Sequence, residues 1–88
     1  MEVKRGQNAY YIGESQEKYD GILQFVEKDG KIDAQHTIVR PAMEGQGLAG
    51  ELVKRLIADA RAEGKKIIPT CSYVNKKLQG EEFDDVRA

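Results

Sequence analysis

The sequence has little of several features that mark particular classes of protein. It contains one cysteine, Cys71, so no disulfide can form within the chain, which fits a reducing compartment. Its 14 basic and 15 acidic side chains give a formal net charge of −1, so we expect no broad basic surface and no nucleic acid as primary partner. Two small positive clusters, Lys65-Lys66 and Lys76-Lys77, could still serve a phosphate-rich small ligand.

Long apolar runs are also missing. No stretch approaches the roughly 20 residues needed to cross a bilayer, so no membrane segment is expected. The charged start Met1-Glu2-Val3-Lys4-Arg5 is not followed by an apolar stretch, which argues against a secretory signal. The sequence also shows no repeat, no low-complexity linker and no cluster of metal-ligand residues. We therefore expect a cytoplasmic protein that binds no metal.

What is present fits one small domain over residues 1–88. A chain of this length buries roughly 60–65 % of the surface that its unfolded form exposes, so the core is modest. With 33 % charged and 40 % hydrophobic residues, the composition is that of an ordinary globular protein. There is room for one sheet and one or two helices.

The first half of the chain predicts four strands, at residues 2–5, 9–12, 19–28 and 31–39. Asp29-Gly30, between the last two, is typical of a two-residue hairpin turn in which both positions take φ > 0.

Counting back from that turn gives a register for the hairpin. The pairs are Lys28 with Lys31, Phe25 with Ala34, Leu23 with His36 and Gly21 with Ile38. This register puts His36 and Ile38 on the face toward the helix, and Thr37 and Val39 on the more polar opposite face.

The second half predicts a helix, a short strand and a second helix. The apolar residues that recur at helical spacing are Leu48, Leu52, Val53, Leu56, Ile57 and Ala60, and Gly64 is a good helix stop. Residues 66–70 read as a short buried strand and residues 72–78 as a short helix. We expect the acidic segment 81–88 to be frayed or loosely docked. The order predicts an α/β (α+β) fold with a mixed, mostly antiparallel sheet, one main helix and a short C-terminal helix.

The segment that joins the fourth strand to the main helix is rich in glycine. Gly45 and Gly47 allow φ > 0 and a close approach of another molecule, and the helix end that follows carries a partial positive charge. A phosphate or pyrophosphate suits such a site, although two glycines could also serve only to make a tight turn. The segment is neither a P-loop nor a dinucleotide fingerprint, because the lysine of the first and the later acidic residue of the second are absent.

This turn resembles the acetyl-CoA-binding signature of the GNAT superfamily of N-acetyltransferases, (Arg or Gln)-x-x-Gly-x-(Gly or Ala). Gly47 and Ala49 match its last two positions, whereas Glu44 stands where Arg or Gln is usual. The segments 36–39 and 67–74 resemble the minimal single-domain branch of that superfamily. Together with the helix, these motifs cover about half of the chain, and they imply a truncated GNAT-like fold.

The resemblance implies that the cofactor is acetyl-CoA or coenzyme A. Its pyrophosphate would lie on the amides of Glu44, Gly45, Gln46, Gly47, Leu48 and Ala49, and its pantetheine arm would pair with Ile38 and Val39 between two splayed strands. The thioester would end near Cys71 and Ser72. The chain is too short for the extra elements that build the acceptor site in larger members, so an open, shallow acceptor site is expected.

Three residues are candidates for catalysis. Cys71 precedes a short helix and is marked by the resemblance as a nucleophile, although a free cysteine can equally be a small buried hydrophobe. His36, the only histidine, suits a general base but can equally be structural. Tyr73 could protonate the departing thiolate, as a tyrosine does in many larger GNAT enzymes, or could simply pack.

Three functions are compatible with these residues. The first is an acetyl-CoA-dependent N-acetyltransferase that acts on an unidentified amine, either a small molecule or a protein lysine. The second is a module that binds CoA or acyl-CoA with little or no turnover. The third is a small interaction domain in which the glycine turn is only structural. A monomer or a weak homodimer, formed through an exposed sheet edge, is expected.

Overall fold

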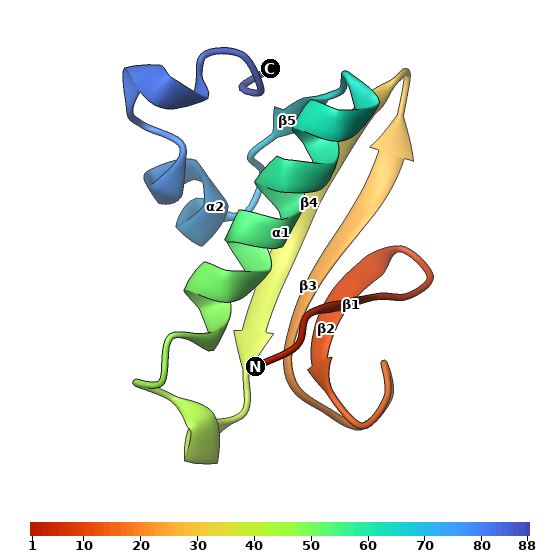
Figure 1. The fold of residues 1–88 in the computed structure, drawn as a ribbon, viewed down its shortest axis with the longest axis vertical. Helices are drawn as coiled ribbons and strands as arrows, with labels where there is room; N and C mark the ends of the chain where they lie inside the picture. The colour runs from red at the N-terminus through yellow and green to blue at the C-terminus, as the bar shows by residue number, and fades with distance from the viewer.

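Five strands form one sheet in the order β1-β2-β3-β4-β5 in the computed structural model, which describes residues 1–88 (Figure 1). Neighbouring strands from β1 to β4 are antiparallel, and β5 runs parallel to β4, so the predicted mixed sheet is confirmed. The strands are β1 Lys4–Arg5, β2 Ala9–Gly13, β3 Tyr19–Lys28, β4 Lys31–Val39 and β5 Lys66–Ile68. The helices are α1 Leu48–Glu63 and α2 Ser72–Lys77, with 3-10 turns at Pro41–Met43 and Glu81–Phe83.

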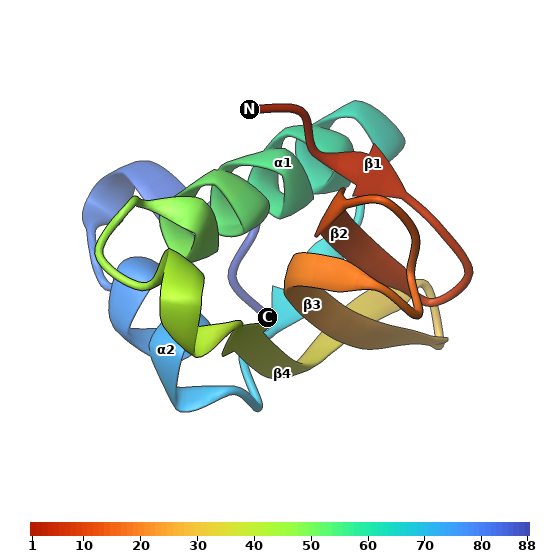
Figure 2. The same cartoon turned by 90° about the horizontal axis from the view of Figure 1, so that it is seen from below.

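Helix α1 covers one face of the sheet and supplies six of the 16 buried residues of the core (Figure 2). Its buried residues are the six that the helical spacing predicted: Leu48, Leu52, Val53, Leu56, Ile57 and Ala60. They pack with buried sheet residues such as Leu23, Phe25 and Ile32. The packed stripe, rather than helix propensity alone, holds α1 in place. Neither helix is long and apolar enough to cross a membrane.

The hairpin turn between β3 and β4 forms as predicted. Asp29 has φ of 52° and Gly30 has φ of 75°, the left-handed values that a tight hairpin turn needs. Lys28 lies opposite Lys31, which confirms the predicted start of the register.

A β-bulge then makes the predicted register wrong farther along the hairpin. Phe25 pairs with Ala34, but Gln24 pairs with His36, so Gln35 is an extra residue in β4. Leu23 therefore lies opposite Thr37 instead of His36, and Gly21 opposite Val39 instead of Ile38. The physical reason is that one inserted residue reverses which side chains face each side of the sheet. His36 and Ile38 are exposed on the face away from α1.

The C-terminal segment is firmly docked, which corrects the prediction that it is frayed or loosely docked. Val86 is fully buried, and the Ile67 amide donates to its carbonyl oxygen at 2.6 Å. The Ala88 amide donates to the Ile67 carbonyl at 2.9 Å, so the segment lies along the outer edge of β5. Arg87 fastens it further by donating to the carbonyl oxygens of Leu78 and Gly80. The acidic composition of this segment suggested an exposed tail, although its single valine, Val86, is enough to anchor it.

Candidate cofactor-binding site

The glycine turn leads directly into α1. Gly45 and Gly47 both have φ of 82°, a conformation that side chains with a Cβ rarely adopt, and Gly47 is the residue that precedes the helix. A Cβ placed on either glycine would meet no other atom within 4 Å. Glycine is therefore favoured at these positions by the backbone conformation. Crowding by the rest of the protein is not the reason.

The amides of this turn are left without partners inside the protein. From Gly45 to Gly50, no backbone N–H donates to another backbone group, and no side chain caps the helix. The first helical hydrogen bond beyond them runs from Glu51 to the Gly47 carbonyl at 3.1 Å. Unpaired N–H groups at a helix start attract an anion, because the helix carries a partial positive charge at this end.

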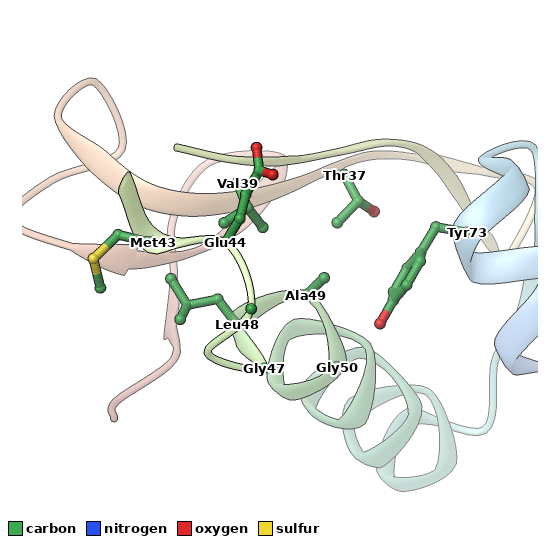
Figure 3. Close-up of a pocket in the computed structure, with 10 residues that line it drawn as sticks. Thr37, Val39, Met43, Glu44, Gly47, Leu48, Ala49, Gly50 and Tyr73 are labelled. Atoms are coloured by element: carbon green, nitrogen blue, oxygen red, sulfur yellow. The ribbon is translucent and has the colours of Figure 1, made fainter. Parts of the chain in front are cut away.

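A cavity of about 560 Å³ lies beside these amides (Figure 3). Its walls come from the end of β4, the glycine turn, the first turn of α1 and the side chain of Tyr73. The lining residues are Thr37, Val39, Met43, Glu44, Gly45, Gly47, Leu48, Ala49, Gly50 and Tyr73. Its size is in the range usual for small-molecule sites.

One edge of β4 is open next to this cavity. Strand β5 pairs only with Lys31, Ile32 and Asp33, and the last bond across the gap runs from the Cys71 amide to the Ala34 carbonyl at 2.8 Å. Beyond this point β4 continues with no strand on that side. The two segments therefore splay apart.

Alternation along β4 decides which main-chain groups face the open edge. The Arg40 amide donates to the Asp20 carbonyl at 2.8 Å, so Arg40 and Ile38 turn their main-chain groups toward β3. Thr37 and Val39 turn theirs the other way, toward the gap. An extended ligand in the gap would therefore bond to Thr37 and Val39, and Ile38 does not line the cavity.

Cys71 lies behind Thr37 at the closed end of the gap. Its Sγ is 3.5 Å from Oγ1 of Thr37, and its side chain is half-buried against the core. Burial by itself raises the pKa of the Cys71 thiol. Hydrogen bonds from the Thr37 hydroxyl and from the amides of Val74, Tyr73 and Thr37 outweigh that effect and hold the pKa below its ordinary value. The thiol itself does not line the cavity, whereas Thr37, whose hydroxyl it contacts, does.

Tyr73 forms the wall of the cavity opposite β4. Its ring stands across the opening from Thr37, and its hydroxyl points toward the first turn of α1 (Figure 3). The hydroxyl is 3.8 Å from where a Cβ on Gly50 would lie, an ordinary van der Waals distance, so the ring reaches the first turn of α1. The ammonium of Lys77 lies 5.5 Å from the centre of the ring, within the range of a cation–π contact.

Glu44, the departure from the expected signature, turns its carboxylate away from the amides. Figure 3 shows the side chain of Glu44 directed past β4, while Gly47 and Ala49 lie on the other side of the loop. The carboxylate is exposed and forms no ion pair. An anion on the turn would therefore meet the Glu44 backbone more closely than its charge.

The structure brings together most of the residues predicted to bind the cofactor. The lining includes Val39, Glu44, Gly45, Gly47, Leu48 and Ala49, whereas Ile38, Gln46, Cys71 and Ser72 lie outside it. Of the catalytic candidates, Tyr73 lines the cavity and His36 does not, because the bulge turns His36 to the opposite face.

Three lining residues were missed by sequence reasoning. Thr37 was assigned to the wrong face, and no local signal reveals the bulge. Met43 lies on a short 3-10 turn that was not predicted. Gly50 had a usable signal, since a glycine in the first turn of a helix suggests close packing at that point. No group of three or more His, Cys, Asp and Glu side chains is placed to hold a metal.

Comparison with known proteins identifies the family. The family described as GCN5-related N-acetyl-transferase matches residues 9–86. Among solved structures, the chain is similar to the NMR solution structure of a GCN5-like protein from Staphylococcus aureus that is proposed to be an N-acetyltransferase. The two share 30 % identity with a TM-score of 0.79, over 99 % of this chain and 87 % of the other. A search of curated proteins gave no match. The chain therefore belongs to the GCN5-related N-acetyltransferase family.

Proposed function

We propose that the protein binds acetyl-CoA in this cavity and transfers the acetyl group to a primary amine. The observation that carries the proposal is the row of unpaired amides from Gly45 to Gly50, which borders a cavity that continues along the open edge of β4. The amides supply donors for a pyrophosphate. The main-chain groups of Thr37 and Val39 supply the partners for the amide-containing pantetheine arm.

The residues present fit such a ligand. The turn offers unpaired N–H donors, and no side chain fills the space beside Gly45 and Gly47. The opposite wall offers an aromatic ring, and the floor is the apolar side of Leu48 and Val39. A polar head on the amides and a thin, partly apolar arm along the strand would thus each meet matching groups.

The chemistry that acetyl-CoA supplies is an acetyl thioester, which a neutral amine attacks at the carbonyl carbon. The protein orients the two partners, which removes much of the entropic cost of bringing them together. The Thr37 main-chain N–H, which faces the gap beside the Cys71 sulfur, would exchange that contact for a hydrogen bond to the oxygen that becomes negative. Tyr73 lines the cavity with its hydroxyl directed at the first turn of α1, and it would give its proton to the departing thiolate after the ring turns toward Thr37.

A covalent route through Cys71 is a variant of the same proposal. The Cys71 thiolate would attack the thioester, forming a new thioester on Sγ and releasing the CoA thiolate, and the amine would then take the acetyl group and restore the thiolate. The lowered pKa of Cys71 supports this route. The route requires the sulfur to reach the cavity, because Thr37 lines it and Cys71 does not.

A binding module with little turnover is the second candidate function. The favouring observation is that no histidine lines the cavity and that Glu44, the one acidic residue in the lining, points away. Without a base in the cavity, the amine must arrive deprotonated or lose its proton to water. Slow transfer follows from that absence even when binding is intact.

Titration with acetyl-CoA tests the binding step. Labelled protein is followed by NMR at the amides of Gly45, Gly47 and Ala49, and we expect their signals to shift most. The variant Ala49→Glu places a bulky carboxylate on the cavity wall and should weaken binding by at least about tenfold. Ala58→Glu, with the same change on the exposed face of α1, should bind like the unmodified protein. Shifts confined to other regions would overturn the proposal.

Mass spectrometry separates transfer from binding alone. Protein incubated with acetyl-CoA and either polyamines or lysine peptides is examined for acetylated acceptor and for an acetyl adduct on Cys71. Acetylated amine supports the transferase, and binding without any product leaves the module. If Cys71→Ala transfers as fast as the unmodified protein, the covalent route is excluded.

A further inference from the structure

The two lysine clusters of the sequence have different fates in the structure. Lys65 pairs with Glu27 at 3.0 Å and with Glu63 at 3.2 Å, and Lys66 donates to the Asp85 carbonyl at 2.8 Å. That cluster is used to hold the far end of α1 together. Lys77, in the other cluster, pairs with no carboxylate and lies over the ring of Tyr73.

A second cavity of about 220 Å³ lies between α1 and the C-terminal elements, next to the first. Gly50 borders both cavities, so the second one begins where the row of unpaired amides ends. Lys54 of α1 and Lys77 of α2 both line it, and Phe83 adds an apolar surface. The volume is sufficient for a phosphate group and part of a nucleoside.

The charge of this second cavity is positive on balance. Glu51 is the only acidic residue in its lining, and it pairs with Lys54 at 3.4 Å. That pair is weak, since 78 % of the Lys54 side chain is exposed to solvent. Lys77 has no such partner, so its ammonium group is available to an anion.

We propose that Lys77, assisted by Lys54, binds a phosphate monoester, namely the 3′-phosphate on the nucleotide half of CoA. The inference rests on the proposed function. With the pyrophosphate on the amides of Gly45 to Gly50 and the pantetheine arm along β4, the nucleotide half must leave in another direction. The second cavity adjoins that point at Gly50 and carries the matching charge.

A comparison of CoA with dephospho-CoA, which lacks only the 3′-phosphate, tests the inference. Both are titrated into the unmodified protein by calorimetry and by NMR at low salt. We expect CoA to bind about three- to tenfold more tightly, a ratio that shrinks as salt screens this exposed contact. In Lys77→Gln, CoA affinity should fall to that of dephospho-CoA, while dephospho-CoA affinity stays unchanged.

Lys76→Gln is the matched control, because it removes the neighbouring charge, which does not line the cavity. It should keep the preference for CoA. Equal binding of the two ligands to the unmodified protein overturns the inference, as does a preference that survives in the double variant Lys54→Gln, Lys77→Gln. In both of these outcomes the shifts at Gly45 and Gly47 remain. If neither ligand shifts those amides, the proposed function itself fails, and the inference fails with it.

Discussion

The two ends of α1 share a left-handed glycine but differ in whether the neighbouring backbone groups are hydrogen-bonded. Each is flanked by a glycine in the left-handed conformation, Gly47 with φ of 82° and Gly64 with φ of 66°. At the C-terminal end the Gly64 amide donates to the Arg61 carbonyl at 3.3 Å, and the Lys65 amide donates to the Ala60 carbonyl at 2.9 Å. At the N-terminal end the amides meet no acceptor of the protein.

Side chains deepen this contrast. Near the C-terminal end, Arg5 pairs with Glu63 at 2.6 Å and Arg61 pairs with Asp85 at 2.9 Å, which ties α1 to β1 and to the C-terminal segment. No comparable ties surround Gly47, where a cavity lies instead. A glycine at a helix end therefore does not by itself indicate a binding site. What distinguishes the two ends is whether the backbone groups beside the glycine already have partners.

The largest expected effect concerns the docked C-terminal segment. Val86→Ala should lower the free energy of unfolding by about 2 kcal/mol, because Val86 is fully buried. The shifts that acetyl-CoA causes at the Gly45 and Gly47 amides should stay unchanged, since the glycine turn lies at the other end of α1. Urea denaturation and the NMR titration measure the two quantities. Val26→Ala, the same change at an exposed valine, should cost less than about 1 kcal/mol. A large loss of binding in Val86→Ala would show that the two ends are coupled.

The glycine pair tests the contrast directly. Gly47→Ala and Gly64→Ala each force a Cβ into the left-handed region and should each cost about 1 kcal/mol of stability. Their effects on binding should differ. Gly47→Ala should weaken acetyl-CoA binding by at least about tenfold, because its backbone shift moves the amides. Gly64→Ala should leave binding unchanged, and equal losses in both variants would contradict the assignment of the site.

A smaller effect is expected at Cys71, at the closed end of the gap beside β4. Thr37→Val removes the hydroxyl beside Sγ and should raise the pKa of the Cys71 thiol, so alkylation by iodoacetamide near neutral pH should slow about threefold. Thr37→Ser keeps the hydroxyl and should restore the rate. The lowered native pKa also means that thiolate formation adds stability above the ordinary thiol pKa. That contribution is lost as pH falls through the native value. An unchanged alkylation profile in Thr37→Val would refute the role of the hydroxyl.

The smallest effect is expected at the C-terminal end of α1. The hydrogen bond from Arg5, followed by that from Lys65, lowers the pKa of Glu63, so the stability that Glu63 adds is present above its ordinary pKa. It is lost as pH falls through the lowered native value. Arg5→Gln should cost about 0.5 kcal/mol at neutral pH, since the pair is partly exposed, and less in acid. A cost that does not depend on pH would indicate that Arg5 acts through its contacts with Tyr10 and Phe25 instead.

The sequence allowed the order of elements, the core stripe of α1 and the hairpin turn to be predicted, because each depends on residues close together in the chain. Asp29-Gly30 specifies its turn, and the spacing from Leu48 to Ala60 specifies the buried face. The faces of His36 and Thr37 could not be predicted, since the extra residue Gln35 leaves no local pattern.

The site was predicted in part for the same reason. The glycine turn is a local feature, but its unpaired amides and the wall formed by Tyr73 depend on contacts between distant segments. The docked tail likewise depends on a pairing with Ile67 that its acidic composition does not suggest.

Side chains alternate between the two faces of β4, and the bulge at Gln35 reverses that alternation halfway along the strand. Before Gln35, every second side chain faces the core, so Ile32 and Ala34 are buried under α1. After Gln35, the alternation is reversed, and Thr37 and Val39 lie on the face that a strand without the bulge would give to His36 and Ile38. One strand thus completes the core with its first half and lines the cavity with its second half. Deleting Gln35 should restore the alternation and replace the cavity wall with an imidazole and an isoleucine.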